Sequence, residues 1–144
     1  MQPGLGVLIN QMSDRGSAVL EKSLGKTIAK VFLKDDDLKF KFTDGTGMKI
    51  YDGGQSCCES RWMHTDDELN HFEGATFLNA EVRDGGDVDE TEYKKITKNE
   101  WGPESCQSQF LIITTSTGTF TVVNYVDHNG YYGGFSMNVE ADNE

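Results

Sequence analysis

The sequence predicts one α+β domain with a mostly antiparallel sheet, and the main observation behind this prediction is an internal repeat. Residues 25–35 and 74–84 lie 49 positions apart and match in type at most positions, including Gly, Thr, the apolar sites and a closing basic-Asp pair. Each copy is typical of a short helix followed by three strands. Two units of about fifty residues are too few for a solenoid, so we expect a single pseudo-symmetric domain.

The length of the chain leads to the same domain organisation. A chain of 144 residues suits one core, and neither half is large enough to bury its own apolar face. We expect residues 1–16 to form an N-terminal arm and residues 17–144 to form the domain. Repeat one spans 17–60 and repeat two spans 65–135. The second repeat contains an acidic insertion at 85–108, and a loop of that length is usually functional or disordered.

Capping residues predict the two helices. Ser17 is placed to cap a helix over Ala18–Leu24 that ends at Gly25, the residue type common in a left-handed C-cap. The segment Thr65-Asp-Asp-Glu68 fits the capping box. The second helix should therefore begin there, run to Phe72 or Glu73, and stop at Gly74.

Alternating apolar residues between Gly-containing turns predict the strands. In Leu38–Phe42 the apolar side chains share one face while Lys39 and Lys41 share the other, as in a half-buried strand. The hairpin turn that follows is Asp44–Gly47. The predicted strands are 27–33, 38–43, 48–51, 76–83, 109–115, 119–125 and 134–140.

The charge of the chain disfavours direct nucleic-acid binding. There are 24 acidic and 13 basic residues, which gives a net charge of −11, and the only basic cluster along the sequence is Lys94, Lys95 and Lys98. No apolar run approaches the roughly 18 residues needed to span a bilayer. The first residues lack the basic and long apolar regions of a signal peptide. We expect a cytoplasmic protein without a membrane partner, in which the three cysteines are free thiols.

Carboxylates are concentrated in residues 59–73 and 84–104. They form either solvated faces that keep the protein soluble or a surface for a basic partner protein. Tyr131 and Tyr132, next to two glycines, form either an aromatic contact patch or a plug at the end of the core. On the partner hypothesis, the binding residues are Asp66, Asp67, Glu68, Glu73, Asp87, Asp89, Glu90, Glu92, Tyr131 and Tyr132.

The loops after the third strand of each repeat contain the residues best suited to catalysis. The first holds Cys57, Cys58 and Glu59, and the second holds Asp127 and His128. If pseudo-symmetry brings the loops together, a Cys57 or Cys58 thiolate would face His128, with Asp127 or Glu59 orienting the imidazole. The competing interpretation is that both cysteines are buried packing residues.

No metal and no cofactor are expected. The residues of suitable type lack the C-x2-C and H-x3-H spacings of a structural zinc site, and the side chains of adjacent cysteines diverge. A Gly-rich phosphate loop, a zinc-protease helix and a G-x-S-x-G elbow are also missing from the sequence. The residues considered as ligands are Cys57, Cys58, His64, His71, Cys106 and His128.

Three segments form a specific motif set: Ser56-Cys-Cys-Glu59, Thr65-Asp-Asp-Glu-Leu69 and His128-Asn-Gly-Tyr-Tyr-Gly-Gly-Phe135. Together they resemble an uncharacterised family of small proteins found mostly in bacteriophages and prophages, over residues 24–135. The resemblance implies an accessory protein that binds and disables a host factor, for example an anti-CRISPR-like inhibitor, and it implies no catalytic residue. An acidic surface suits an inhibitor that occupies a nucleic-acid site. The alternative function is a small Cys-His hydrolase or transferase.

Overall fold

The computed structural model describes residues 14–54, 59–96, 105–128 and 135–142. The predicted N-terminal arm, Cys57, Cys58, Tyr131 and Tyr132 therefore lie outside the described residues, apart from residues 14–16 of the arm. At seven described positions only the backbone is considered: Asp14, Arg15, Glu59, Glu90, Ile96, Ser105 and His128.

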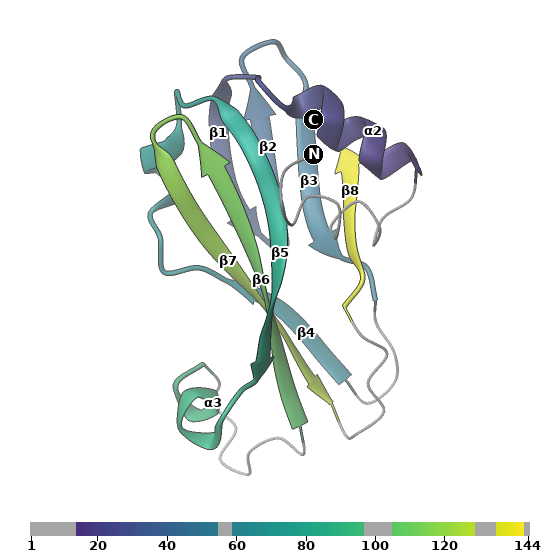
Figure 1. Ribbon diagram of the computed structural model, residues 1–144, viewed down its shortest axis with the longest axis vertical. Helices are drawn as coiled ribbons and strands as arrows, with labels where there is room; N and C mark the ends of the chain where they lie inside the picture. The colour runs from purple at the N-terminus through teal and green to yellow at the C-terminus, as the bar shows by residue number, and fades with distance from the viewer. Residues whose placement is uncertain (1–13, 55–58, 97–104, 129–134, 143–144) are drawn as a thin grey trace.

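The chain forms two antiparallel sheets of four strands each, with few helices (Figure 1). The first sheet has the order β1-β2-β3-β8, with β1 at Ile28–Lys34, β2 at Asp37–Phe42, β3 at Gly47–Asp52 and β8 at Met137–Ala141. The second sheet has the order β4-β7-β6-β5, with β4 at Glu59–His64, β5 at Phe77–Asp87, β6 at Ser105–Thr115 and β7 at Gly118–His128. The helical elements are α2 at Asp14–Ser23, the 3-10 turn η1 at Leu69–Phe72, and α3 at Glu90–Ile96. The structure is thus mostly antiparallel β.

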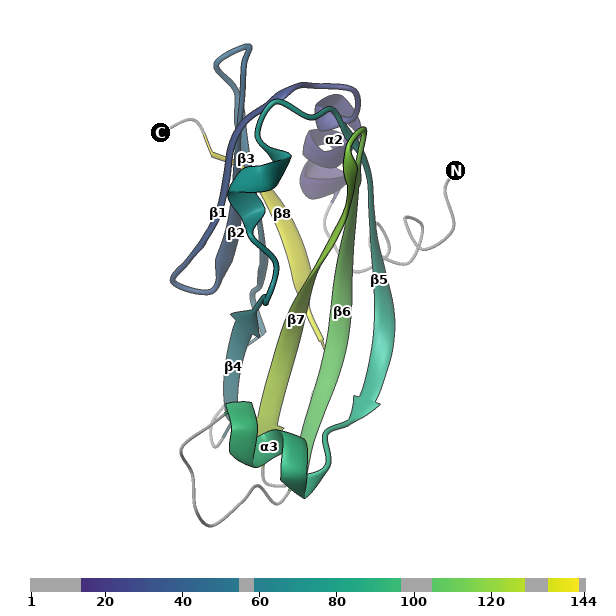
Figure 2. The same cartoon turned by 90° about the vertical axis from the view of Figure 1, so that its left-hand side faces the viewer.

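The two sheets pack face to face around one hydrophobic core (Figure 2). Phe40 of β2 lies at the centre, with its ring 5.3 Å from Phe77 of β5 and 6.4 Å from Phe120 of β7. Leu20 of α2 is fully buried in the same core. Burial of a Phe or Leu side chain contributes about 1.5–3 kcal/mol, so these contacts hold the sheets and α2 together.

The second sheet extends beyond the first. Its strands β6 and β7 have 11 residues each, whereas β2 and β3 have 6. α3 lies at the far end of the second sheet (Figures 1 and 2). There Tyr93 packs with Cys106 and Tyr125 in a smaller hydrophobic cluster. Among the described elements, no helix covers the middle of the outer face of the second sheet.

The segments predicted to be equivalent meet through reciprocal hydrogen bonds. Gly25 N donates to Phe77 O and Gly74 N donates to Ile28 O, both at 2.7 Å. Thr27 and Thr76 form an isolated antiparallel bridge between them. Gly25 and Gly74 have φ angles of +88° and +89°, and a Cβ at either position would meet open space. Glycine is required at both sites by the backbone conformation and not by crowding.

The predicted helices need correction. α2 begins at Asp14 and ends at Ser23, so Ser17 lies inside the helix and does not cap it. The predicted second helix is only the 3-10 turn η1, and no side chain caps it. The Thr65 hydroxyl instead donates to Thr121 O at 2.7 Å and accepts from Asp67 N at 3.1 Å. The Thr65 hydroxyl therefore forms a tertiary contact with β7 instead of the helix cap that the sequence predicts.

Every predicted strand overlaps an observed one, but β4 and α3 were not predicted. β4 was not recognised because its sequence, Glu59–His64, has no run of alternating apolar residues. The insertion at 85–108 was predicted as a loop. Its described parts form the end of β5, α3 and the beginning of β6.

Candidate functional site

The two loops that contain the predicted catalytic residues leave the fold at the same place. Gly53 N donates to Ser136 O at 2.9 Å on one side of the loops. On the other side, Glu59 lies directly opposite His128 in the β4–β7 ladder. The backbone stems of both loops are therefore paired. The side chains of Cys57, Cys58, Glu59 and His128 lie outside the described residues, so a contact between thiol and imidazole stays a prediction.

A buried ion pair anchors these stems. Asp52 Oδ2 accepts from Arg61 Nη1 at 2.8 Å and from Asn124 Nδ2 at 2.7 Å. Asp52 Oδ1 accepts from the backbone N–H groups of Gly54 at 2.9 Å and Ser136 at 3.3 Å. The Asp52 and Arg61 side chains are only 3% and 6% exposed. Because both carboxylate oxygens already accept two hydrogen bonds, Asp52 is suited to holding the stems in place and not to proton transfer.

Asp127 and Cys106 lie opposite each other at the α3 end of the second sheet. Asp127 Oδ2 accepts from the Tyr93 hydroxyl at 2.6 Å. Burial raises the pKa of the Cys106 thiol to about 12, and the charges of Asp127 and Glu92 add to the effect. A thiol with so high a pKa is not a nucleophile at neutral pH, so Cys106 is a packing residue.

The outer face of the second sheet has an apolar centre, which we call the outer strip. Trp62 lies opposite Tyr125, Phe110 opposite Val123, and Ile112 opposite Thr121 in the ladders. The Trp62 and Tyr125 rings stack with centroids 5.3 Å apart. Trp62, Phe110, Ile112 and Val123 are each partly exposed, while Tyr125 is buried. The outer strip consists of Trp62, Phe110, Ile112, Val123 and Tyr125.

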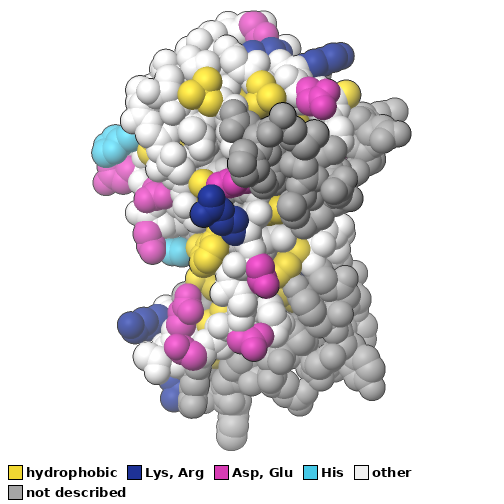
Figure 3. Space-filling view, in the orientation of Figure 1, with side chains coloured by type: hydrophobic (Ala, Val, Ile, Leu, Met, Phe, Trp, Pro, Cys, Tyr) yellow, Lys and Arg dark blue, Asp and Glu magenta, His cyan; other side chains and the backbone are white. Residues whose placement is uncertain are grey.

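Carboxylates from both acidic segments border the outer strip. At one end, Asp67 Oδ2 accepts from Thr121 N at 2.9 Å, and Asp66 Oδ1 lies 2.8 Å from His64 Nε2. At the other end, Glu92 Oε1 accepts from the Tyr125 hydroxyl at 3.5 Å. Figure 3 views this face and shows hydrophobic side chains in its middle, acidic side chains beside and below them, and a basic side chain near the centre. The structure thus brings residues about 25 positions apart in sequence to the edges of one apolar surface.

The other predicted partner-binding residues lie further from the strip. Glu68 and Glu73 flank η1 and are exposed, and Glu68 Oε2 lies 2.9 Å from His71 Nε2. Asp87 accepts from Gln107 Nε2 at 2.7 Å. Asp89 accepts from Glu92 N at 2.8 Å and so caps the start of α3. The Glu90 side chain, Tyr131 and Tyr132 lie outside the described residues.

Sequence reasoning missed Trp62, the aromatic residue at the centre of the outer strip, because β4 was not recognised as a strand. Its one signal in the sequence was a Trp between Arg61 and Met63 close to an acidic segment. Among the described residues, no group of three or more His, Cys, Asp or Glu side chains is placed to hold a metal ion. No helix in the described ranges is both long and apolar enough to cross a bilayer.

Comparison with known proteins yields one match. The model of a family described as "Domain of unknown function (DUF7448)" matches residues 21–137. No protein with a curated description and no solved structure matches the chain.

Proposed function

Because the chain belongs to the DUF7448 family, whose description names no activity, we propose a function from the geometry of the site: the protein acts by binding another protein through the outer face of its second sheet. The observation that carries this proposal is the outer strip with carboxylates at both ends. Protein interfaces commonly have an apolar core rich in aromatic residues and a polar rim.

The composition of the strip suits a contact of high energy. Trp and Tyr are the residue types most often found at interface hot spots, and Trp62 stacks on Tyr125 so that its ring is held in one orientation. The ring therefore loses little conformational freedom on binding. The carboxylates of Asp66, Asp67 and Glu92 favour a partner whose own apolar contact is bordered by Lys or Arg.

The finer proposal concerns the partner. A surface of Lys and Arg next to apolar side chains is common on enzymes that act on nucleic acid. We propose that the partner is such an enzyme from a host cell and that this protein is a phage-type inhibitor, of the anti-defence or anti-CRISPR-like kind, as the resemblance of its motifs implies. The carboxylates would lie where phosphates lie in the substrate complex. The acidic border of the strip supports this partner class.

The experiment is a capture from host lysate with the immobilised protein, followed by affinity measurement with each purified partner. The Asp66→Lys variant reverses a charge at the border of the strip, at a side chain that is 95% exposed. Glu21→Lys makes the same charge change at an exposed position on α2 and serves as the matched control. Trp62→Ala removes the ring at the centre of the strip. Circular dichroism and thermal unfolding verify that each variant is folded.

We expect Asp66→Lys and Trp62→Ala each to weaken binding about tenfold or more, and Glu21→Lys to change it less than twofold. Binding of the wild-type protein should weaken as salt shortens the Debye length from roughly 10 Å to 3 Å. The proposal is wrong if partners bind equally well to the wild-type protein, Asp66→Lys and Trp62→Ala.

A second candidate function, a Cys-His hydrolase or transferase, is favoured by one observation: the loop stems are paired at Gly53–Ser136 and at Glu59–His128. Replacement of Cys57, Cys58 or His128 by Ala would then abolish turnover of a test ester or thioester. That loss should depend little on salt. Turnover that survives all three replacements would exclude this function.

We also propose that residues 17–60 and 65–135 are two copies of one unit. The hydrogen bonds of Gly25 to Phe77 and of Gly74 to Ile28 support this. Gly25 and Gly74 are 49 residues apart, and so are their partners, Ile28 and Phe77. The sheets support it as well. Each has three consecutive strands, β1-β2-β3 or β5-β6-β7, and a fourth strand, β8 or β4, that pairs with the last of the three.

A further inference from the structure

The outer face of the first sheet gathers five of the 13 basic residues of the chain. Lys30 lies opposite Lys41 between β1 and β2, and Lys39 lies opposite Lys49 between β2 and β3. Lys34 shares the face of Lys30 because strand residues alternate between faces. We call this surface, formed by Lys30, Lys34, Lys39, Lys41 and Lys49, the lysine face.

In the described part of the chain, two of these lysines, Lys39 and Lys49, form ion pairs, and the opposed pair Lys30 and Lys41 does not. Lys39 Nζ lies 3.7 Å from Asp142 Oδ2, and Lys49 Nζ lies 3.6 Å from Glu140 Oε2. By contrast, none of the ion pairs formed by described residues includes Lys30 or Lys41. Like charges directly opposite each other destabilise a sheet. An anion placed between Lys30 and Lys41 would remove that repulsion.

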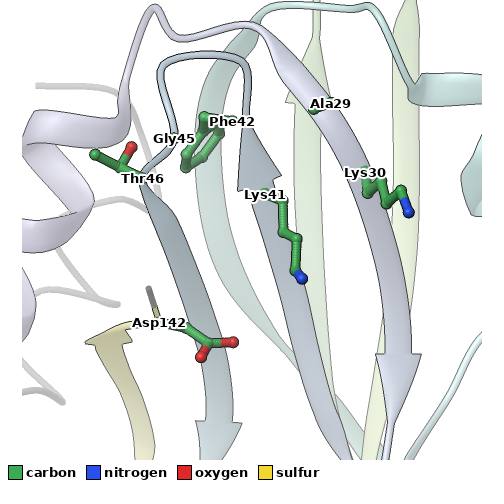
Figure 4. A pocket seen from close by; sticks show the side chains of 7 residues that line it. All are labelled: Ala29, Lys30, Lys41, Phe42, Gly45, Thr46 and Asp142. Carbon is green, nitrogen blue, oxygen red and sulfur yellow. The ribbon is translucent and has the colours of Figure 1, made fainter. Parts of the chain in front are cut away.

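Lys30 and Lys41 also line a pocket of about 230 Å³. Figure 4 shows that the two side chains come from neighbouring strands and that both ammonium groups point away from the turn at Gly45 and Thr46. Among the described residues that line this pocket, Asp142 is the one carboxylate, and it is already paired with Lys39. The pocket is therefore bordered by two lysines that form no ion pair with its one described carboxylate.

Two aromatic side chains share the lysine face. Phe32 lies opposite Lys39, and Tyr51 lies opposite Asp37, and both rings are partly exposed. Tyr51 is held in place because its hydroxyl donates to Glu140 at 2.6 Å and Lys49 Nζ lies 5.3 Å from its ring centroid. Aromatic rings between basic side chains on a sheet form a platform on which unpaired bases stack. No described helix or strand lies over this face (Figure 2).

The net charge of −11 does not prevent anion binding at this face. Packed sheets are about 10 Å apart, and the side chains of the two outer faces point in opposite directions. The lysine face and the carboxylates around the outer strip are thus separated by more than the Debye length of about 8 Å at physiological salt. Local charges dominate, and among the described residues of this face five lysines stand against three carboxylates, Asp37, Glu140 and Asp142.

We propose that the lysine face binds single-stranded nucleic acid, with Lys30 and Lys41 contacting phosphates and Phe32 and Tyr51 stacking on bases. Single strands are favoured over duplex because a stacking platform requires unpaired bases. This site lies on the opposite side of the molecule from the outer strip and does not depend on the protein-binding proposal. The proposal differs from the sequence-based expectation of no direct nucleic-acid binding, which considered only lysines that are clustered along the chain.

The test is fluorescence anisotropy with labelled single-stranded DNA and RNA of about 20 nucleotides, titrated with the full chain at several salt concentrations from about 50 mM. The double variant Lys30→Gln/Lys41→Gln removes the two opposed charges that line the pocket. Lys22→Gln/Lys95→Gln removes two exposed charges from α2 and α3 and is the matched control. Phe32→Leu keeps an apolar side chain but removes the ring. Thermal unfolding verifies that the variants are folded.

We expect the Lys30→Gln/Lys41→Gln variant to bind at least about tenfold more weakly and the control to change less than about twofold. The slope of log affinity against log salt should fall in magnitude by about 1.4, which corresponds to two lost phosphate contacts. Phe32→Leu should weaken binding several-fold and leave the slope unchanged. Any of three outcomes would overturn the proposal: no binding at low salt, equal losses in the double variant and its control, or equal affinity for duplex or for anionic lipid vesicles.

Discussion

Replacement of Asp52 by Asn is the sharpest test of the polar network that anchors the two loops. The amide has the size of the carboxylate, so it leaves packing unchanged. Asp52 accepts four hydrogen bonds, two on each oxygen, from Arg61, Asn124, Gly54 and Ser136. An amide has one oxygen and one NH₂ group. In either orientation of the new side chain, an NH₂ group faces two donors, and the Arg61 guanidinium loses the carboxylate that balances its charge.

The magnitude follows from the burial of the pair, whose side chains are 3% and 6% exposed. Removing one partner of a buried ion pair costs about 3–5 kcal/mol. The total free energy of unfolding of a domain is about 5–15 kcal/mol, so Asp52→Asn removes a large part of it. With a urea m-value of about 2 kcal/mol/M, the midpoint of unfolding should fall by about 1.5–2.5 M.

The assay is equilibrium urea unfolding followed by tryptophan fluorescence and circular dichroism. Asp66→Asn makes the same chemical change at a side chain that is 95% exposed, and it should alter the free energy of unfolding by less than about 0.5 kcal/mol. The double variant Asp52→Asn/Arg61→Met removes both charges and should recover part of the loss, because an apolar replacement of a buried pair is often tolerated.

A loss of less than about 1 kcal/mol in Asp52→Asn, at an unchanged m-value, would refute the reasoning. Strict additivity would refute it too: if the Asp52→Asn and Arg61→Met effects simply sum in the double variant, the two side chains are not coupled.

Three further predictions concern backbone strain and buried titratable groups. Gly25→Ala and Gly74→Ala should each lower the free energy of unfolding by about 1–2 kcal/mol, because both positions have positive φ angles, and losses that differ by more than about 1 kcal/mol would contradict the repeat. In a chain whose other cysteines are Ala, iodoacetamide at about pH 7.5 should label Cys106 on the order of 10³ times more slowly in the folded than in the urea-unfolded protein; fast labelling of the folded protein would contradict its burial. The pKa values of Cys106 and Tyr125 are both raised to about 12 in the folded state, so the folded protein retains these protons when the unfolded chain has lost them. The contribution of these two groups to the free energy of unfolding should therefore be constant up to about pH 8.5 and fall between about pH 9 and 12, less steeply in Tyr125→Phe. Urea midpoints that stay flat between about pH 9 and 12 would show that these groups are not buried.

Local patterns predicted much of the secondary structure. The alternation in Leu38–Phe42 identified β2 and its inward face, because side-chain direction in a strand depends only on position along the chain. Gly25 and Gly74 marked the ends of helical segments because positive φ angles exclude most other residues. The acidic segments at 59–73 and 84–104 were also evident, since charge is a property of composition.

Long-range contacts decided the rest. Thr65 satisfies the capping box by sequence, yet its hydroxyl bonds to Thr121, 56 residues away. β4 lacks the alternation of an isolated strand because its inward-facing Arg61 is balanced by Asp52, which the chain places on the other sheet.

The binding surfaces depend on strand pairing. Each of Trp62, Tyr125 and Phe110 is an unremarkable residue along the chain, and only the order β4-β7-β6 places them side by side. Lys30 and Lys41 are likewise separated in sequence and become neighbours through the β1–β2 register. Composition and periodicity are local properties, and they determined which residues point outward. Hydrophobic burial sets the register between distant strands, and this register determined which of the outward residues form a surface.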